Sequence, residues 1–430
     1  MKPSIKEDFL HFLWQHKLFH KENLTSTTGE SVQVLESGLL NHDAGPDFFN
    51  AKIKIGTQLW AGNVEIHVKS SDWYVHHHEL DAAYDSVILH VVWQDDVTVF
   101  NPSNQAVMTL VLKDYVSQEV LGNYRYLFYS PKKFLNCEQD IHEIDLFLFQ
   151  NFKERLYFDR LEKKSEIILN LLQESKMDWE AVLFKMLAKN FGLKVNGESF
   201  LQIANAIDFN VFRKTFSSIL QLEALLFGHA NLLDNTTTST YFLSLRKEYR
   251  YLEKKFQLTS ISSVTPKFFR LRPNNFPTIR LSQLANLYTK RQNLFSKVME
   301  IDNLKDYYAF FDIAVSPFWQ THYTFDKESK KSFKKLTKSF VDLLLINTII
   351  PLKVVYQKHL GNFNSDTIIK LIQEIKAEKN GILDNFSTLK IQADNALDSQ
   401  AILHLYQNYC TQDKCLSCVI GNKVLKKTNR

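Results

Sequence analysis

Hydrophobic and polar residues alternate in two stretches near the start of the chain, residues 47–55 and 60–69. Successive side chains of a β-strand point to opposite faces, so this pattern predicts two strands, each with one buried face. The second strand has an apolar face made of Val64, Ile66 and Val68. Its opposite face carries three polar groups in a row: Glu65, His67 and Lys69.

Further elements are expected on either side of these strands. Apolar residues recur at helical spacing over residues 5–19, and a short strand is expected at residues 32–35. Asp72 can cap a short helix that runs to about residue 83. Residues 87–93 are almost wholly apolar, as in a strand that is buried on both faces. The predicted order is therefore helix, three strands, helix, strand.

The hydrophobic pattern changes to helical spacing at about residue 141 and stays helical to about residue 409. The chain has no fixed-period repeat, so a solenoid is not indicated. We therefore expect an α/β (α+β) domain with a mixed sheet at residues 1–130. A large all-α domain is expected to follow at residues 131–430.

Two short motifs lie on the predicted strands. Pro46 and Asp47 start the first strand, and Glu65 lies within the second. These motifs resemble those of the PD-(D/E)xK nuclease superfamily, and the order of elements is similar to the core of that superfamily. The resemblance implies a PD-(D/E)xK-like sheet and a nuclease that hydrolyses phosphodiesters in DNA. In the active site that this resemblance implies, Asp47 and Glu65 hold Mg²⁺ or Mn²⁺, and the metal ion activates a bound water.

The sequence departs from the superfamily motif at one position. Two residues after Glu65 the motif has lysine, whereas this chain has His67. Either His67 takes the place of the lysine, or His67 takes the place of the acid and Lys69 is the lysine. The first arrangement keeps both carboxylates, so we prefer it, with Lys69 as an auxiliary cation. Glu7, on the opening helix, is a candidate for a further ligand or water-orienting group.

The same departure favours an alternative function without catalysis. In this alternative the N-terminal domain is a degenerate nuclease fold that binds nucleic acid or acts as a scaffold, and the chain has a structural metal site. Taken singly, Asp47 is more simply the start of a turn, and Glu65 a solvated strand residue. Divalent-metal binding that is lost on Asp47→Ala would favour the catalytic function.

Longer strings support a resemblance over nearly the whole chain. They are GPDFFNAKI, GNVEIHVKSSDW, YDSVILHVVW, FRLRPNNFPTIRLSQLA and YCTQDKCLSCVIG. By these strings the chain resembles an uncharacterised bacterial family of about this length, catalogued only as a domain of unknown function. That resemblance implies little about activity, so the function has to be argued from the residues.

Five histidines fall within the predicted α/β domain: His67, His76, His77, His78 and His90. Imidazole and carboxylate groups together can hold a transition metal. Their spacing matches no zinc signature, solvent exposure is the simplest explanation of the HHH run, and a histidine in a buried strand is usually a hydrogen-bonded core residue. We therefore rank a histidine site below the carboxylate site, except for His67, which shares a face with Glu65.

The four cysteines of the chain are Cys137, Cys410, Cys415 and Cys418. Three of them form a C-x4-C-x2-C pattern at the C-terminus, and four thiolates can hold zinc or an iron–sulfur cluster. Some PD-(D/E)xK proteins of DNA repair and CRISPR systems are similar in using one distant cysteine and a C-terminal trio to hold an iron–sulfur cluster, although spacing and order differ here. Clustering in an otherwise cysteine-free chain favours a metal over unliganded core thiols.

A basic segment between two predicted helices is a candidate for contact with nucleic acid. It contains Lys267, Arg270, Arg272 and Arg280, interleaved with phenylalanine and proline. Arginine and phenylalanine can meet phosphates and stack on bases. Arginines in such a loop also commonly pair with helix ends or carboxylates, which is the simpler explanation.

Net charge, cysteine content and the absence of several common motifs limit the classes of protein to which this chain can belong. The net charge of +5 permits nucleic-acid binding without requiring it. The opening MKPSIKEDFL has no signal-peptide pattern, four cysteines do not make a secreted disulfide framework, and we expect no membrane span. We expect a cytoplasmic protein. Phosphate-loop, dinucleotide and serine-hydrolase motifs are absent from the sequence, which disfavours those enzyme classes.

Overall fold

The computed structural model describes residues 4–234, 237–258 and 265–427. The chain forms two compact units. The first comprises Met1–Phe152, Asp384–Ile391 and Leu403–Arg430, and the second comprises Lys153–Leu383 and Gln392–Ile402. This division differs from the predicted domains at residues 1–130 and 131–430, because the C-terminal segment belongs to the same unit as the N-terminus.

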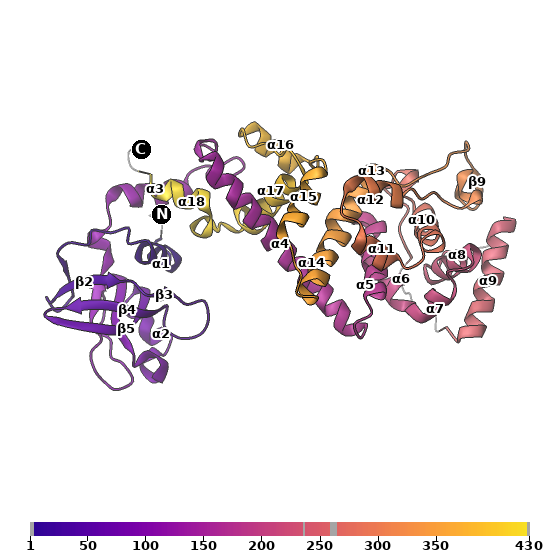
Figure 1. The fold of residues 1–430 in the computed structure, drawn as a ribbon. Helices are drawn as coiled ribbons and strands as arrows, with labels where there is room; N and C mark the ends of the chain where they lie inside the picture. Colours follow the sequence, from indigo (N-terminus) through magenta and orange to yellow (C-terminus); the bar gives the residue numbers. More distant parts are fainter. Residues whose placement is uncertain (1–3, 235–236, 259–264, 428–430) are drawn as a thin grey trace. The chain divides into compact units, whose positions relative to one another are not determined.

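A seven-stranded sheet organises the first unit (Figure 1). Its order is β1-β2-β4-β5-β6-β7, and β3 pairs with β4. The strands are β1 (Leu24–Thr25), β2 (Ser31–Glu36), β3 (Leu39–Leu40), β4 (Phe48–Ile55), β5 (Gln58–Lys69), β6 (Val87–Gln94) and β7 (Thr109–Val111). The pairs up to β5 are antiparallel, whereas β5 with β6 and β6 with β7 are parallel. The predicted mixed sheet in the N-terminal part is therefore confirmed.

The opening helix α1 (Glu7–Gln15) contacts β5. The buried side chains of α1 are Phe9, Leu10, Phe12, Leu13 and Trp14. The helix is shorter than the predicted range of residues 5–19, because the chain leaves the helical conformation at His16 and Lys17 has a left-handed backbone with φ 51°.

The connection from β5 to β6 consists of three short turns. These are α2 (Asp72–Val75), η1 (His78–Leu80) and η2 (Ala82–Tyr84). The prediction of one helix from Asp72 to about residue 83 is therefore wrong. The helix ends because His77 adopts a left-handed backbone with φ 62°, which an α-helix cannot continue through.

The second predicted strand is buried on both faces where the polar row begins. Val64, Glu65, Ile66 and His67 are all buried, and only Lys69 of the polar row is exposed. The simpler interpretation of Glu65 as a solvated strand residue is therefore wrong, and His67 is buried beside it. A buried carboxyl and a buried imidazole both need partners, so their neighbours decide what this face does.

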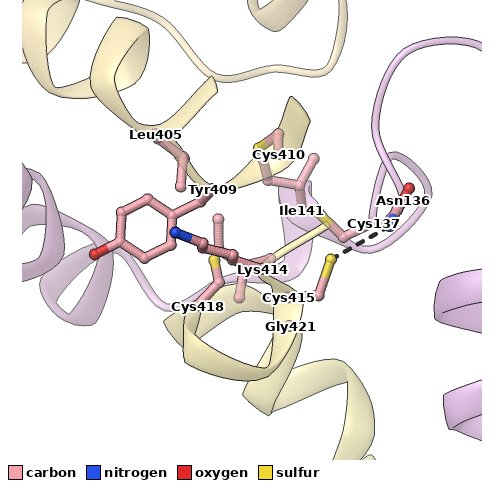
Figure 2. Close-up of a pocket in the computed structure, with 11 residues that line it drawn as sticks. Asn136, Cys137, Ile141, Leu405, Tyr409, Cys410, Lys414, Cys415, Cys418 and Gly421 are labelled. Atoms are coloured by element: carbon pink, nitrogen blue, oxygen red, sulfur yellow. Dashed lines mark hydrogen bonds between the residues drawn. The ribbon is translucent and has the colours of Figure 1, made fainter. Parts of the chain in front are cut away.

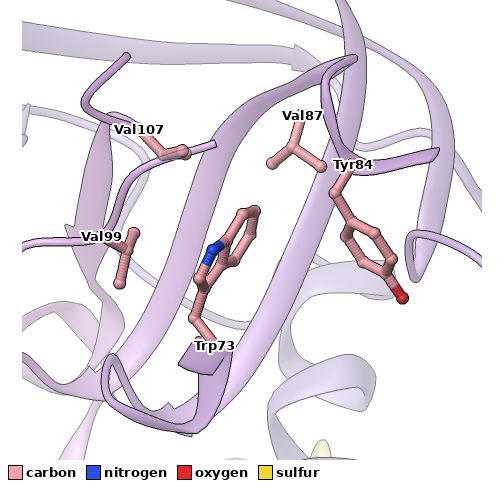
Figure 3. Close-up of a cluster of buried hydrophobic side chains, with 5 residues drawn as sticks. All are labelled: Trp73, Tyr84, Val87, Val99 and Val107. Carbon is pink, nitrogen blue, oxygen red and sulfur yellow. The ribbon is translucent and has the colours of Figure 1, made fainter. Parts of the chain in front are cut away.

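A small hydrophobic cluster supports this part of the sheet. Trp73, from α2, packs among Tyr84, Val87, Val99 and Val107 (Figure 3). The indole N–H of Trp73 donates to the carbonyl oxygen of Phe100 at 3.0 Å, which satisfies its one polar atom. The cluster therefore anchors the chain immediately before the His76–His78 run.

The C-terminal segment completes the first unit. It contains η8 (Cys410–Gln412), η9 (Cys415–Ser417) and α18 (Val419–Leu425), and α18 lies beside α3 (Gln118–Tyr129) (Figure 1). The side-chain amide of Asn123, on α3, donates to the carbonyl oxygens of Leu425 at 3.4 Å and Lys427 at 2.8 Å. Hydrogen bonds thus join this segment to a helical residue 302 and 304 positions earlier in the sequence.

The second unit is built mainly of helices, which confirms the predicted helical region. They are α5 (Trp179–Phe191), α6 (Leu193–Ala206), α7 (Phe209–Lys214), α8 (Ile219–His229), α9 (Thr240–Phe256), α10 (Pro277–Lys290), α11 (Leu294–Glu300), α12 (Leu304–Phe310), α13 (Lys338–Leu344), α14 (Ile350–His359) and α15 (Ser365–Glu374). Three further helices run across the border between the units: α4 (Leu146–Glu174), α16 (Gly381–Thr388) and α17 (Ala396–Asn408). A two-stranded hairpin, β8 (His322–Thr324) and β9 (Lys327–Glu328), interrupts the helices.

One helix of the second unit has the length and apolar composition of a membrane span. It runs from Lys338 to His359 through a π-turn at Leu345–Ile349. Most of its apolar stretch is buried inside the protein, which is the setting of a core helix. Length and composition alone therefore do not mark it as a membrane span.

Candidate functional site

Four side chains of the first unit direct their polar atoms at one place beside β5. His67 Nε2 lies 3.1 Å from His76 Nδ1 and 3.4 Å from Glu65 Oε1. His78 Nε2 lies 3.1 Å from the same Glu65 oxygen. The ligand atoms of the three histidines all lie within 4.8 Å of one another. We call Glu65, His67, His76 and His78 the histidine–glutamate cluster.

The backbone after β5 turns so that two of three consecutive histidines face this cluster. α2 ends at Val75, His76 follows it, and His77 takes the left-handed conformation before η1 begins at His78. The side chain of His77 is 76% exposed, whereas His78 is buried. Solvent exposure, the explanation that we expected for the HHH run, therefore applies to His76 and His77 and is wrong for His78.

His67 is held by both of its ring nitrogens. Its Nδ1 lies 2.9 Å from Nε2 of His90, which is buried on β6. His90 is thus a hydrogen-bonded core histidine, as its buried strand led us to expect. Histidines that bind a metal through one nitrogen generally use the other for such a bond, which fixes the orientation of the ring.

Aromatic rings hold His78 in place. The ring of His78 stacks on Tyr84 with centroids 3.7 Å apart, and Trp73 packs edge-on against it at 5.4 Å. His78 Nε2 is buried and makes no hydrogen bond to any described group, although Glu65 Oε1 lies 3.1 Å away. The orientation of His78 therefore directs its Nε2 into the cluster, towards Glu65.

Asp47 lies next to Glu65, as the resemblance predicts. The backbone N–H of Asp47 donates to Glu65 Oε2 at 3.1 Å, and Asp47 Oδ2 accepts the Ile66 N–H at 2.9 Å. The same Asp47 oxygen lies 3.1 Å from Nε2 of His11, on α1. Glu7, one helical turn before His11, interacts electrostatically with His11, Asp47 and His76. Asp47, Glu65 and His67 are therefore brought together, with Glu7 nearby.

The electrostatics of the cluster favour a bound cation. Burial, and then the charge of Asp47, raise the pKa of Glu65 to about 9. Burial, and then the neighbouring His90, His78 and His76, lower the pKa of His67 to about 2. His67 is therefore neutral at physiological pH, which is the form that binds metals. A cation held by neutral imidazoles would also remove the penalty on a charged Glu65.

Three separations between ligand atoms in the cluster fit a tetrahedral metal ion. Zn²⁺ binds histidine nitrogen and carboxylate oxygen at ~2.1 Å, which sets ligand atoms ~3.4 Å apart along the edges of a tetrahedron. The separations within the cluster that involve His67, His76, His78 and Glu65 are 3.1, 3.4 and 3.1 Å. The donor set of imidazole with one carboxylate suits Zn²⁺, Mn²⁺ or Fe²⁺ better than Mg²⁺, which prefers oxygen ligands.

Lys69 lies away from this cluster. It is exposed at the end of β5, and its ammonium is one of the charges that act on Asp96. The pKa of Asp96 is lowered, because hydrogen bonds from Ser71 and Ser70 together with Lys69 outweigh the effect of burial. The expected role of Lys69 as an auxiliary cation beside Glu65 therefore has no support from its position.

The basic segment lies in the second unit and is only partly exposed. Lys267, Arg270 and Arg272 are exposed. Arg280 is buried, donates to Gln283 at 2.9 Å and Asn275 at 2.6 Å, and lies 3.8 Å above the ring of Phe340. The guanidinium of Arg280 is therefore used inside the fold, and the expectation that it contacts nucleic acid does not fit its position.

The four cysteines all belong to the first unit and line one cavity there. The sequence analysis grouped Cys137 with the three cysteines of the C-terminal segment, and the structure places all four on the wall of the same cavity.

Three residues of the site were missed or ranked too low from sequence: His11, His76 and His78. One usable signal was present, because Glu7 and His11 are four residues apart on a predicted helix and so share a face. No such signal existed for His76 and His78, whose common direction depends on the left-handed backbone of His77. Their ranking below the carboxylates is the main correction to the predicted site.

Comparison with known proteins identifies a family but no activity. A model of the family described as "Protein of unknown function (DUF2851)" matches residues 7–381. No curated protein and no solved structure matches the chain. Since the matched range covers most of the chain, the protein belongs to the DUF2851 family.

Proposed function

We propose that this protein is a metal-dependent hydrolase that cleaves phosphodiester bonds in nucleic acid, DNA in the first instance. The observation that carries the proposal is the histidine–glutamate cluster, where three imidazole nitrogens and one carboxylate oxygen lie 3.1–3.4 Å apart along the measured pairs. Such a cluster next to a second carboxylate, Asp47, is a sufficient set of groups for metal-assisted hydrolysis.

His67, His76, His78 and Glu65 would hold the metal. His76 is exposed, so the site opens to solvent on that side and leaves room for a water or a substrate oxygen. A metal bound there would polarise the phosphodiester and lower the pKa of a bound water. We propose Zn²⁺ or Mn²⁺, in place of the Mg²⁺ that two carboxylates alone would favour.

Asp47 and His11 would act on the proton and the developing charge. Asp47 Oδ2 accepts from the Ile66 N–H, which fixes the carboxylate beside the cluster. Burial lowers the pKa of His11, but its hydrogen bond to Asp47 and the charges of Asp47 and Glu7 outweigh this and raise it. Asp47 can therefore orient an attacking water, and a protonated His11 can stabilise negative charge on the phosphate.

Two further features support nucleic acid as the substrate. The motifs at Pro46-Asp47 and Glu65 resemble those of PD-(D/E)xK nucleases, and His67 stands two residues after Glu65, where that superfamily has lysine. A recess of about 530 Å³ adjoins His11 and is lined in part by Lys6, Asn41 and Lys414. The two lysines can bind phosphates that flank the scissile bond, while Asp8 and Asp413, which line the same recess, offset their charge.

The test uses two neighbouring histidines as a matched pair. His76→Ala removes one proposed ligand at an exposed position, so it should leave the fold intact. Loss of a group that only supports a ligand lowers metal affinity ~10–100-fold, so loss of a ligand should lower the affinity for Zn²⁺ or Mn²⁺ at least ~10-fold. His77→Asn changes the next residue, whose side chain points away, and asparagine tolerates the left-handed backbone. Titration calorimetry and cleavage of labelled single- and double-stranded DNA and RNA give the two readouts.

The proposal fails if the wild-type protein binds neither metal, or if His76→Ala and His77→Asn cleave equally well. Glu65→Gln should also abolish cleavage, because it removes a ligand charge while keeping the shape of the side chain.

A non-catalytic nucleic-acid-binding or scaffold protein is the second candidate. The position of Lys69 favours this second function. PD-(D/E)xK nucleases have a lysine beside the acidic residues, whereas here only His67 stands at that position and Lys69 is exposed at the end of β5. In the absence of metal, His90, His67 and His76 would form a hydrogen-bonded chain with a structural role only. Metal binding and nucleic-acid binding without any cleavage would identify this second function.

A further inference from the structure

Four cysteines surround one small cavity in the first unit (Figure 2). Cys137 lies just before η4 (Ile141–Glu143), and Cys410, Cys415 and Cys418 lie on or next to η8, η9 and α18. They are all the cysteines in the chain, and none of the four forms a disulfide. The cavity has a volume of about 20 Å³, which is room for about one water molecule, so a larger group has to displace the side chains around it.

The remaining lining of this cavity is largely apolar. It includes Ile141, Leu405 and Ile420. The four cysteines are therefore the metal-binding side chains of this cavity, and apolar side chains form much of the rest of its wall.

Contacts outside the cavity hold the two cysteine-bearing segments together. Asn136 donates to Asp413 Oδ1 at 2.9 Å and to Cys415 Sγ at 3.4 Å. Lys132 donates to the same Asp413 oxygen at 3.0 Å. Glu138 accepts the backbone N–H groups of Lys133, Phe134 and Leu135, which shapes the loop before Cys137. These contacts fix the positions of the segments that carry Cys137 and Cys415 before any metal binds, and such supporting contacts orient the ligands of metal centres.

We propose that Cys137, Cys410, Cys415 and Cys418 together bind one iron–sulfur cluster. The spacing of the sulfurs distinguishes this from zinc. Zn–S bonds of ~2.3 Å bring four sulfurs within ~3.8 Å of one another. Within the described residues, a triplet of ligand atoms that lie within 4.8 Å of one another is found among the histidines and not among the cysteines. A cluster binds each cysteine through a different iron, so its sulfurs lie further apart around a central body.

The proposed cluster is independent of the histidine–glutamate cluster. None of the four cysteines contributes to the metal ligands of that site, and the two sites use different donors. A loss of one centre should therefore leave the other loaded, which allows the two proposals to fail separately.

The experiment measures iron, acid-labile sulfide and zinc in the full-length chain, purified without oxygen from cells supplied with iron. Wild type should be brown, with iron and sulfide in equal amounts. Cys137→Ser and Cys415→Ser should lose both elements. Ser417→Ala is the matched control, because it lies between two of the cysteines and does not line the cavity; it should keep both. His76→Ala should also keep both.

Three results would overturn the proposal. They are wild-type protein without sulfide, zinc in place of iron at the cysteines, and a Cys137→Ser variant that keeps its full iron content. Should the serine variants fail to fold, thiol labelling of wild type gives the answer. All four cysteines should resist a maleimide while the cluster is bound and react once oxidation and a chelator have removed it, and equal labelling before and after removal would contradict the proposal.

Discussion

Two buried carboxyl groups in this chain, Glu223 and Glu65, differ in the groups that surround them. Glu223, on α8, is fully buried, and its Oε1 accepts from Ser282 at 2.6 Å and Ser316 at 2.5 Å while Tyr241 donates to Oε2. Its hydrogen bonds come from hydroxyl groups around it. Glu65 instead faces His78 Nε2, which makes no hydrogen bond to any described group. The first arrangement is complete by itself, whereas the second contains the groups to which we assign a metal ion.

Glu223 predicts an unusual pH dependence of stability. Burial raises its pKa above the ordinary value of 4.5, although the hydrogen bonds from Ser282, Ser316 and Tyr241 oppose this. The unfolded chain therefore releases the proton first as the pH rises. Wild type should lose stability relative to Glu223→Gln, by about 1.4 kcal/mol per pH unit, from about pH 4.5 up to the folded pKa.

Unfolding of both proteins measured from pH 4 to pH 8 gives this difference. Glu198→Gln, on the exposed surface of α6, is the control and should run parallel to wild type. A Glu223→Gln difference that is constant with pH would contradict the assignment of a raised pKa.

The short turn between α2 and η1 shows why the site could only partly be predicted. Alternation along β5 placed Glu65 and His67 on one face, and the position of Asp47 before the adjacent strand placed it nearby. Both inferences depend only on strand periodicity. The directions of His76 and His78 depend on one backbone angle at His77, which periodicity does not contain. The left-handed backbone of His77 ends the predicted helix. It also turns His76 and His78, which the sequence analysis had ranked too low, towards Glu65 and His67.

His77→Val tests the role of that turn. A β-branched residue pays about 1–2 kcal/mol in the left-handed conformation, so the turn should shift to relieve the strain. We expect metal affinity at the histidine–glutamate cluster to fall although no ligand is changed. His77→Asn should bind metal as wild type does, and calorimetry on the two variants measures the contrast. Equal affinities would show that the turn is not what aligns the ligands.

Gly421 in α18 determines how closely that helix approaches the cysteine turn. A Cβ added there would lie 2.1 Å from the carbonyl oxygen of Cys415, which is backbone and has little freedom to move. Gly421→Ala should therefore displace η9 from α18, destabilise the first unit and reduce the metal content of the cysteine cavity.

Gly122, in α3, is the control for this substitution. An added Cβ at Gly122 meets no atom within 4 Å, so Gly122→Ala should be neutral or stabilise by roughly 0.5–1 kcal/mol. Thermal unfolding of both variants measures the contrast. A Gly421→Ala protein as stable as Gly122→Ala would show that α18 can move away from η9 without cost.

At the scale of the whole molecule, sequence patterns gave the classes of structure but not the division of the chain. The change of periodicity near residue 141 correctly separated a sheet-containing part from a helical part. It could not reveal that residues 403–430 return to the first unit, since a C-terminal helix of seven residues looks like any other helix of the second part. That return depends on contacts such as the one from Asn123 to Lys427, and long-range hydrogen bonds leave no local pattern.

Truncation tests whether the C-terminal segment completes the first unit. A chain that ends at Asn408 loses both carbonyl partners of Asn123, whose side chain is buried, and loses the buried side chains of Ile420, Val424 and Leu425. An unsatisfied buried amide costs about 1–3 kcal/mol, and the lost apolar contacts add to it. Amides of α3 should therefore exchange with solvent at least ~10-fold faster.

Hydrogen exchange measured by mass spectrometry resolves this effect by region. Amides of α8 and α10, in the second unit, should keep their protection, because those helices pack against each other within that unit. A chain that ends at Lys427 is the control and should match wild type throughout, since both acceptor carbonyls remain. Unchanged protection of α3 in the shorter chain would mean that the first unit is stable without its C-terminal segment. Loss of protection in both units together would mean that the two units unfold cooperatively. The division of the chain into two compact units predicts the opposite result.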